Sequence, residues 1–514
     1  MLFRSYNNGK IGDITGDFIN NTATAPNYSS GGAIYNGGTI ENITGDFIDN
    51  SAASSGGAIY NYNSTIGDIT GDFIGNTASN EGGAIYNRGT IGDIIGDFIG
   101  NTAGSKGGAI YNRGTIGNIT GNFISNTYGA IYNADNSTIG DITGDFIGNT
   151  ASFSSGTIEN RGTIGDITGD FISNKMKAIY NDSTIGNITG DFISNTYGAI
   201  DNIGTIGNIT GDFIANTNDH FGAIYNVGNI GDITGDFVGN YANYYGGAID
   251  NNYDSSIGNI TGNFIGNKSG GAEGSGGAIS NGGTIGDITG DFIGNYNAVW
   301  GGGNPASGGA ISNSGTIGDI AGDFIGNYAK SETGEAKGGA IYSNRDLNIV
   351  ADNGESLFSG NYVQNGDKKD QQAIFITNTI EEKSLGYSSE HSHSFYQNEP
   401  HKTAVTLNSI NNGKIIFNDK ITGETTKTPI NKYYKEWDSS VGEYITHYVD
   451  DDYNDIDTPT EVSVTPELKI TGDSSSIVQL NNNIENLDIS LSGTNLHLGA
   501  RDNVLDGKIG RAHV

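Results

Sequence analysis

The sequence contains no cysteine and only 6 prolines in 514 residues. Without cysteine the chain cannot build a zinc ribbon, a thiol nucleophile or a disulfide framework. A complete lack of cysteine suits an exported protein, in which premature crosslinks would be harmful. The sequence also lacks any run of about 18 apolar residues, so we expect no membrane-spanning helix.

Positive charge is scarce as well. Lys and Arg number 25 against 58 Asp and Glu, which gives a formal net charge of −33. A nucleic-acid-binding protein needs a basic surface that displaces counterions from phosphates, so nucleic acid is excluded as a partner. The same charge argues against docking on anionic lipid. Although 83 residues are Gly, aromatic residues make up 10% of the chain, which is not typical of a disordered protein.

One repeat dominates the sequence. Its clearest copy is Gly82–Asn87, then Thr90–Ile94, then Gly96–Asn101. The spacing between successive copies runs from 21 to 32 residues, and most of the extra residues fall between the Asn after Phe and the next Ala-Ile. The Phe of this unit recurs thirteen times, at positions 18, 47, 73, 98, 123, 146, 171, 192, 213, 237, 264, 292 and 324.

Each copy predicts one coil of a β-solenoid. Three short segments rich in Ile, Phe, Tyr and Thr favour strands and are separated by Gly and Asn, and no helical periodicity is present. A single coil cannot bury its own apolar face, but stacked coils can. We therefore expect an all-β chain that forms a right-handed parallel β-helix from about Ile11 to about Leu505. At a spacing of about 4.8 Å, its thirteen regular coils would span roughly 60 Å.

Stacking of identical coils also predicts the surroundings of single residues. Phe98 should lie between Phe73 and Phe123 in a continuous aromatic ladder, and Asn101 should share amide hydrogen bonds with the Asn of each neighbouring coil. The Gly-Gly before Ala-Ile allows a corner with positive φ. We expect inward-pointing side chains at Ile85, Ile91, Ile94 and Phe98, and an outward-pointing side chain at Tyr86.

The chain divides into regular and degenerate parts. Residues 6–346 form the regular repeats, and residues 347–508 form degenerate rungs interrupted by two polar stretches, 381–402 and 423–464, which we expect to be loops or excursions. Residues 1–5 and 509–514 resemble translated sequencing-adapter DNA, so we expect the chain to be a fragment of a longer protein. The later rungs are expected at Leu357–Asn361, Ala373–Ile376, Lys414–Phe417, Leu468–Ile470 and Leu487–Ile489.

The alternation of Gly-Gly-Ala-Ile with Phe-x-x-Asn resembles the polymorphic outer-membrane proteins and related autotransporter passengers. The resemblance covers roughly Ile11 to Asn361, although Gly156–Ile158 and Lys177–Ile179 depart from the Gly-Gly-Ala-Ile corner. It implies export, a right-handed parallel β-helix and adhesion at the bacterial surface, with anchoring through a C-terminal region that this sequence does not include. The residues that carry it are Gly31–Ile34 with Phe47–Asn50, Gly82–Ile85 with Phe98–Asn101, and Gly276–Ile279 with Phe292–Asn295.

The repeats show no cluster of acids, bases or cations of the kind that a catalytic site requires. His220, the one histidine between Ile11 and Tyr342, is interpreted as a solvated loop residue, and Gly472–Ser475 does not complete a serine-protease motif. We therefore expect no catalytic residue, no cofactor and no metal site.

One acidic edge leaves two interpretations open. The Asp of Gly-Asp-Phe should stack along one side, either as a cation-binding ladder or as a solvated face that keeps the protein soluble, and the solvated face is the preferred interpretation. Asn replaces this Asp at positions 122 and 263. The edge comprises Asp17, Asp46, Asp72, Asp97, Asp145 and Asp170.

Two short motifs could hold a metal ion. Asp450, Asp452, Asn454 and Glu461 match positions 1, 3, 5 and 12 of a calcium loop, but Asp455 replaces the required Gly and helices are not expected on either side. His391-Ser392-His393 offers two histidines without enough partners for zinc.

These observations favour a non-enzymatic, surface-exposed passenger fragment that is monomeric and acts as an adhesin. Its partner would be a host-cell or extracellular-matrix surface, through a glycan or a protein ligand. The contacts would come from an extended surface that includes the edge loops Ala23–Ser30, Tyr296–Ser307 and Ala329–Lys337. A carbohydrate-active β-helix enzyme and a structural spacer are the alternatives.

Overall fold

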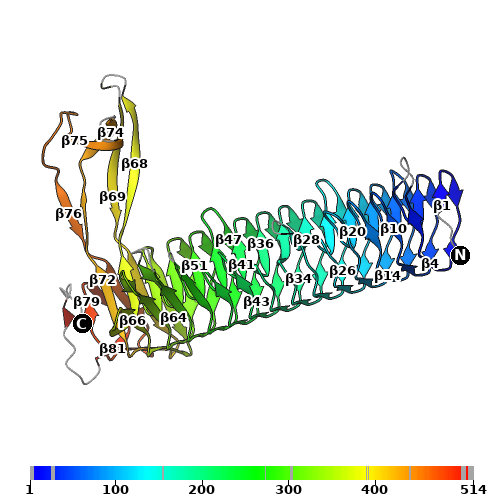
Figure 1. Cartoon of the computed structure of the whole chain (residues 1–514). Coiled ribbons are helices and arrows are strands. Elements are labelled where there is room, and N and C mark those ends of the chain that lie inside the picture. The colour runs from blue at the N-terminus through cyan, green and yellow to red at the C-terminus, as the bar shows by residue number, and fades with distance from the viewer. Residues whose placement is uncertain are drawn as a thin grey trace.

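The computed structural model describes residues 5–24, 29–152, 155–271, 274–300, 305–388, 391, 393–438, 442–498 and 505–506. Within these residues all regular secondary structure is β-strand, which confirms the all-β prediction. The strands stack into a long solenoid with the N-terminus at one end and the C-terminus at the other (Figure 1). The two expected adapter segments lie almost wholly outside the described residues. None of the described residues forms a helix long and apolar enough to cross a membrane.

Each coil contains more strands than the sequence predicted. In the central coil they are β16 (Ile85–Asn87), β17 (Thr90–Ile91), β18 (Ile94–Ile95) and β19 (Phe98–Ile99). The segment expected as one strand from Thr90 to Ile94 is broken at Gly92, where a Cβ atom would lie 2.3 Å from Asp68 Oδ1. The prediction of three strands a coil is therefore wrong, because the chain turns after every two or three paired residues.

The coils stack in parallel and in identical register. Phe98 pairs with Phe73 on one side and with Phe123 on the other. The ring centroid of Phe98 lies 4.8 Å from that of each neighbour, and the stacked rings are almost parallel. This arrangement confirms the parallel β-helix and its phenylalanine ladder.

The core lies inside the coil, as expected. Ile85, Ile91, Ile94 and Phe98 are all buried in one hydrophobic cluster that runs along the solenoid. Tyr86 lies outside this cluster, but it is only 5% exposed because the rings of Tyr60 and Tyr111 stack on its two faces. The outward-facing tyrosines thus form a second ladder.

A buried asparagine ladder closes one corner of each coil. Asn101 donates from Nδ2 to Asn126 Oδ1 at 3.1 Å and to the Phe73 carbonyl at 2.7 Å. Its own Oδ1 accepts hydrogen bonds from the backbone N–H and the Nδ2 of Asn76. The predicted amide ladder is therefore confirmed, and from Asn50 to Asn361 each amide donates to a Phe carbonyl of the preceding coil as well as to the next side chain of the ladder. At the C-terminal end of the ladder, the carboxylate of Asp419 accepts hydrogen bonds from the backbone N–H and the Nδ2 of Asn361.

The degenerate rungs continue the same stack. Phe358 pairs with Phe324 and then with Phe417, so the phenylalanine ladder extends beyond the regular repeats. The rungs lie on β65 (Glu355–Ser359), β67 (Lys368–Thr377), β71 (Lys414–Phe417), β77 (Glu467–Gly472) and β80 (Asp488–Ser492).

The two polar stretches leave the solenoid as one structured arm (Figure 1). Most of this arm is an antiparallel sheet in which Phe395 pairs with Tyr434, and Trp437 pairs with Tyr444. The stretches are thus excursions, which was one of the two expectations, but most of their described residues lie in paired strands and not in loops. The sheet consists of β68 (Thr379–Ser388), β69 (His393–His401), β74 (Lys432–Asp438) and β75 (Glu443–Val449).

Two of the three expected edge loops also form strands. β55 (Tyr296–Val299) pairs with β61 (Tyr328–Ser331), and β56 (Ala306–Ser307) pairs with β62 (Ala336–Lys337). Val299, Ala306, Ala329, Ala336 and Val363 form a small second core there. Residues 25–28 and 301–304 of the expected loops lie outside the described residues.

Candidate functional site

The residue after the inward Ile of each coil occupies one continuous column on the outside of the solenoid. At the N-terminal end this column is a stack of tyrosines, and Tyr111 and Tyr132 still stack at 4.7 Å. Further along, acids and serines replace some of the tyrosines, in identical backbone register. From the third coil the column reads Tyr60, Tyr86, Tyr111, Tyr132, Glu159, Tyr180, Asp201, Tyr225, Asp250, Ser280, Ser312 and Tyr342.

The first two acids of this column are neutralised by cations of the chain itself. Glu159 lies 3.0 Å from Lys106 Nζ and 3.0 Å from Arg161 Nε. Asp201 forms an ion pair with Lys177. Burial raises the pKa of Asp201, and the attraction of Lys177 opposes that rise. Both acids are buried, so these pairs compensate the cost of removing a carboxylate from water.

The third acid has no such partner. Asp250, on β46 (Ile249–Asn251), is 7% exposed and forms no ion pair with any Lys, Arg or His of the described chain. Burial raises the pKa of its carboxyl to about 7, and a hydrogen bond with Ser280 opposes part of that rise. An unpaired buried carboxylate is costly, and such groups are candidates for functional sites.

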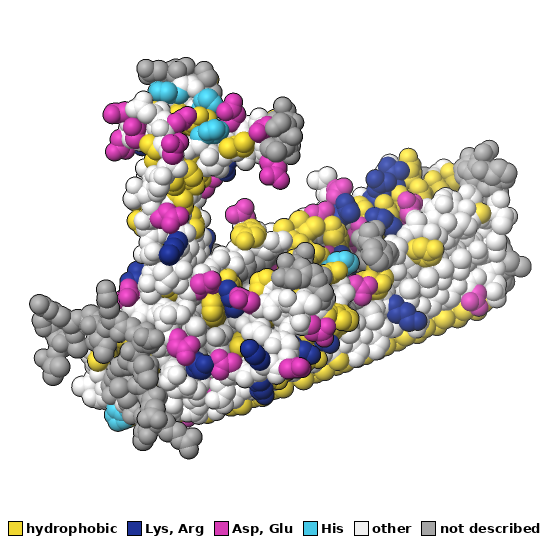
Figure 2. Space-filling model, turned by 60° about the vertical axis from the view of Figure 1, so that its left-hand side comes forward, with side chains coloured by type: hydrophobic (Ala, Val, Ile, Leu, Met, Phe, Trp, Pro, Cys, Tyr) yellow, Lys and Arg dark blue, Asp and Glu magenta, His cyan; other side chains and the backbone are white. Residues whose placement is uncertain are grey.

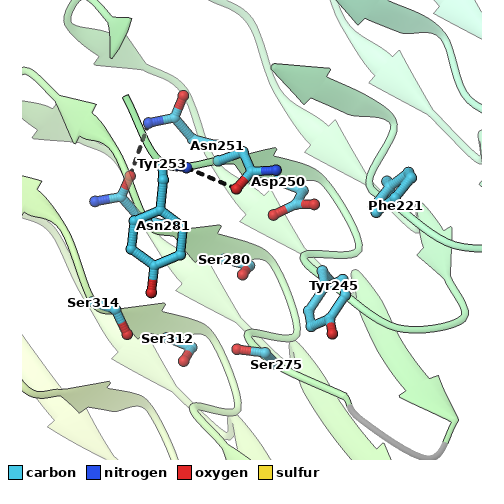
Figure 3. Close-up of a pocket in the computed structure, with 12 residues that line it drawn as sticks. Phe221, Tyr245, Asp250, Asn251, Tyr253, Ser275, Ser280, Asn281, Ser312 and Ser314 are labelled. Atoms are coloured by element: carbon cyan, nitrogen blue, oxygen red, sulfur yellow. Dashed lines mark hydrogen bonds between the residues drawn. The ribbon is translucent and has the colours of Figure 1, made fainter. Parts of the chain in front are cut away.

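Asp250 lies in a hollow on the side of the solenoid (Figure 3). The hollow has a volume of about 380 Å³, and it exists because Asp250, Ser280 and Ser312 stand where other coils carry a tyrosine ring. Aromatic side chains border it: Phe221 and Tyr245, with ring centroids 6.4 Å apart, and Tyr253, which is 69% exposed. Asn251 and Asn281, joined by a hydrogen bond of 2.8 Å, complete the wall near Tyr253.

A second candidate surface lies on the arm. Trp437 is 54% exposed and Tyr444 is 67% exposed, and their rings meet edge to face at 5.1 Å across β74 and β75. Ile445 and Tyr387 are exposed on the same sheet. Acidic and histidine side chains crowd the outer end of the arm (Figure 2). Exposed aromatic rings beside charged groups are typical of protein-binding surfaces.

Side chains on both faces of the sheet stabilise the arm. Tyr433 is buried and donates from its hydroxyl to Glu382, which also pairs with Lys435 at 2.6 Å. Phe395 is buried and contacts the ring of Tyr434 edge to face at 5.7 Å. The arm thus has its own small core, so the exposed rings are displayed on a fixed surface.

The acidic edge predicted from Gly-Asp-Phe has a structural role that sequence reasoning missed. Asp46 Oδ1 accepts the backbone N–H of Asp72 at 2.9 Å, and Asp72 Oδ1 accepts that of Asp97 at 2.8 Å. A parallel ladder repeats this pattern, since Asp68 Oδ1 accepts the N–H of Asp93 at 2.9 Å. Each backbone N–H needs only one acceptor oxygen, and the amide of Asn supplies one as well, which explains why Asn can replace Asp in both ladders. The edge is therefore a row of side chains that accept backbone N–H groups of the next coil, and it is only in part a solvated face.

The candidate calcium run forms a turn. Asp450 Oδ1 accepts the backbone N–H groups of Asp452 and Asn454, each at 2.9 Å, and these hydrogen bonds lower the pKa of Asp450. Glu461 lies on β76 (Glu461–Val464), opposite Pro429. No group of three or more His, Cys, Asp or Glu side chains in the described residues could hold a metal ion.

The remaining candidates do not come together. His391 Nδ1 lies 3.0 Å from Ser388 Oγ, and the ring of His393 lies against Tyr434, while Ser392 is outside the described residues. His220 is exposed in its loop, as interpreted, and its ring lies 5.5 Å from that of Tyr244. Asp473 accepts hydrogen bonds from the hydroxyls of Ser475 and Ser476 within a turn.

The comparisons with known proteins agree with the repeat. The model of the Chlamydia polymorphic membrane protein repeat matches the chain three times, at residues 45–62, 71–88 and 97–113. Each match spans a Phe-x-x-Asn and the Gly-Gly-Ala-Ile that follows it. Searches of the curated proteins and of the solved structures found no significant match. The repeat implies a place at the outer membrane or the cell surface. The chain therefore carries the repeat of the polymorphic outer-membrane protein family, as its Phe-x-x-Asn and Gly-Gly-Ala-Ile motifs predicted.

Proposed function

We propose that this chain is the exposed passenger of an autotransporter-like surface protein and that it acts as an adhesin. The observation that carries the proposal is the arm, which displays the exposed rings of Trp437 and Tyr444 away from a rigid solenoid. Large aromatic rings with one apolar face are the residues that contribute most to protein–protein contacts. Exposing them in water is unfavourable unless a partner covers them.

The solenoid supports this role by its rigidity. Its core is continuous from coil to coil, and backbone hydrogen bonds join every coil to the next. A solenoid of this kind holds the arm at a distance from its base and offers a long lateral surface for further contacts. The partner in this proposal is a protein of the host-cell surface or of the extracellular matrix.

Adhesion of coated beads to host cells tests the proposal. Beads that carry the Trp437→Ala/Tyr444→Ala double variant should lose most of their adhesion, because each buried aromatic ring in an interface is worth about 2 kcal/mol or more. Tyr128→Ala is the matched control, since it removes an exposed ring from the solenoid, away from the arm. Equal adhesion of the parent and the double variant, at equal loading, would contradict the proposal.

The two alternatives predict different results. A spacer would tolerate both sets of substitutions and would respond only to a change in the number of coils. A carbohydrate-active enzyme would release reducing or unsaturated ends from polyuronides or glycosaminoglycans. A glycosidase of the usual kind needs two carboxyl groups about 5 to 10 Å apart, and among the described residues that line the hollow Asp250 is the one acid.

A further inference from the structure

The outer column contains three places where a tyrosine is followed by an acid in the next coil. They are Tyr132 before Glu159, Tyr180 before Asp201, and Tyr225 before Asp250. All three acids are buried and lie in the same backbone register. The column therefore provides an internal comparison of one arrangement in three copies.

In the first two copies a lysine ammonium occupies the place beside the acid. Lys106 Nζ lies 3.0 Å from Glu159 Oε1 and 4.2 Å from the centroid of the Tyr132 ring. Lys177 pairs with Asp201, and its Nζ lies 5.1 Å from the centroid of the Tyr180 ring. The carboxylate and the ring face thus hold one ammonium between them, through an ion pair and a cation–π contact.

In the third copy the chain supplies aromatic rings near Asp250, but no lysine ammonium of the described residues pairs with its carboxylate. Tyr245 directly precedes Gly-Gly-Ala-Ile, the position that Lys106 holds in its own coil. Phe221 stacks on Tyr225 with a centroid distance of 4.0 Å, so the ring face is already covered. Open space of about 380 Å³ takes the place of the lysine beside Asp250.

We propose that this hollow binds the ε-ammonium group of a lysine side chain on a partner protein, with the Asp250 carboxylate as its counter-ion. Phe221 and Tyr245 would contact the aliphatic part of the lysine, and Tyr253 would close the hollow from the side of Asn281 (Figure 3). The occupant is a lysine because the two filled copies of this arrangement in the same chain hold a lysine. The site is separate from the arm, so its failure and the failure of the adhesin proposal can be distinguished.

Binding must depend on pH, because only the ionised carboxylate attracts an ammonium. The raised pKa of Asp250 leaves the carboxyl largely protonated at pH 5.5 and largely ionised at pH 8. Of the groups that face it, Tyr225 and Asp201 belong to the preceding coils of the column, Tyr245 and Tyr253 border the hollow, and Ser280 follows in the next coil. The ring of His220 lies against those of Phe221 and Tyr244, so His220→Gln serves as a control variant for the pH dependence.

The test measures binding of Nα-acetyl-lysine methylamide to the full chain by nuclear magnetic resonance titration. The expected result is saturable binding at pH 8 that is about tenfold or more weaker at pH 5.5, in the parent and in His220→Gln alike. Asp250→Asn should weaken binding at pH 8 by about tenfold or more, because it removes the counter-ion. Asp254→Asn, which removes an exposed negative charge four residues away, should leave the affinity unchanged.

Two further probes decide the chemistry. Nα-acetyl-norleucine methylamide has the same apolar chain without the charge, and it should not bind. Tyr245→Lys places a lysine on the border of the hollow, in the same coil as Asp250, and should abolish binding of the lysine probe by supplying the ammonium from within the chain. Equal binding of the norleucine probe, or binding of neutral N-acetylglucosamine that Asp250→Asn leaves intact, would overturn the proposal. No binding of the lysine probe to the parent at pH 8 would overturn it as well.

Discussion

The carboxylate of Asp97 accepts a hydrogen bond of 2.7 Å from the backbone N–H of Asn122, one coil further along the solenoid. Asp97 therefore connects two coils although it lies on the outer face. The neighbouring residue, Phe98, is fully buried between Phe73 and Phe123. Adjacent residues thus stabilise the same coil boundary in two ways, through one partly exposed hydrogen bond and through a buried ring.

The first prediction separates these contributions. Phe98→Ala should destabilise the central coils by about 3 to 5 kcal/mol, as buried Phe to Ala changes typically do. Asp97→Asn should be neutral or slightly stabilising at low salt, because the amide oxygen can still accept the Asn122 N–H while like charges along the edge are reduced. Hydrogen exchange on both variants measures the difference, with faster exchange after Phe98→Ala confined to the coils near Phe73 and Phe123. If Asp97→Asn opened the coils as much as Phe98→Ala, and calcium protected only the parent, the edge would be a metal ladder.

The second prediction concerns the asparagine ladder. Asn101→Ala removes the acceptor for the backbone N–H and the Nδ2 of Asn76, and it leaves the Phe73 carbonyl without its side-chain donor. Each buried polar group left without a partner costs about 1 to 3 kcal/mol, so the loss should approach that of Phe98→Ala. Thermal unfolding measures the effect. The matched control is Asn80→Ala, which removes an exposed Asn of the neighbouring edge and should change stability by less than about 0.5 kcal/mol.

How far the sequence predicts the structure depends on repetition. Phe98 and Asn101 could be placed from the sequence because identical coils give each residue an identical neighbour above and below. The arm could not be predicted from the sequence, because its sheet pairs Phe395 with Tyr434, and these residues lie in segments that share no repeat and are far apart in sequence. Its alternating strands are polar on most of their surface, so they resemble loops in composition.

The sequence contains a signal of the hollow that sequence reasoning missed. The motif Ala-Ile-Tyr-Asn becomes Ala-Ile-Asp-Asn at Asp250 and Ala-Ile-Ser-Asn at Ser280 and Ser312. The change marks the loss of three rings in successive coils. The missing counter-ion could not be inferred in this way, because the pairing of Lys106 with Glu159 spans two coils and depends on the three-dimensional path of both side chains.

The third prediction concerns Asp250 and pH. The folded chain favours the protonated carboxyl, since burial raises its pKa from 3.8 to about 7. Its contribution to stability is therefore most favourable below about pH 4 and declines as the pH rises toward 7. Each unit of pKa is worth about 1.4 kcal/mol, so Asp250→Asn should stabilise the surrounding coils by up to about 4 kcal/mol at pH 8 and by little at pH 4.

Hydrogen exchange of the backbone amides near Ile249 measures this effect at both pH values, after correction for the intrinsic pH dependence of exchange. Asp232→Asn serves as the control, because Asp232 is exposed and its acceptor role toward Asn259 is kept by an amide. An equal response of the two variants at pH 8 would contradict the prediction.

The fourth prediction converts a paired acid into an unpaired one. Lys177→Met keeps most of the aliphatic volume of the lysine but removes the cation that pairs with Asp201. Breaking a buried ion pair by removing one partner typically costs about 3 to 5 kcal/mol, because the remaining charge stays buried. We expect this loss at pH 8, and we expect it to shrink at low pH, where Asp201 takes up a proton.

A second substitution, Asp201→Asn, should recover most of the stability at pH 8, since no buried charge is then left. Thermal unfolding of the parent, both single variants and the double variant completes the cycle, and the coupling between the two sites should exceed about 1 kcal/mol. If Lys177→Met alone left stability at pH 8 unchanged, a buried carboxylate in this column would need no counter-ion, and the contrast between Asp201 and Asp250 would lose its physical basis.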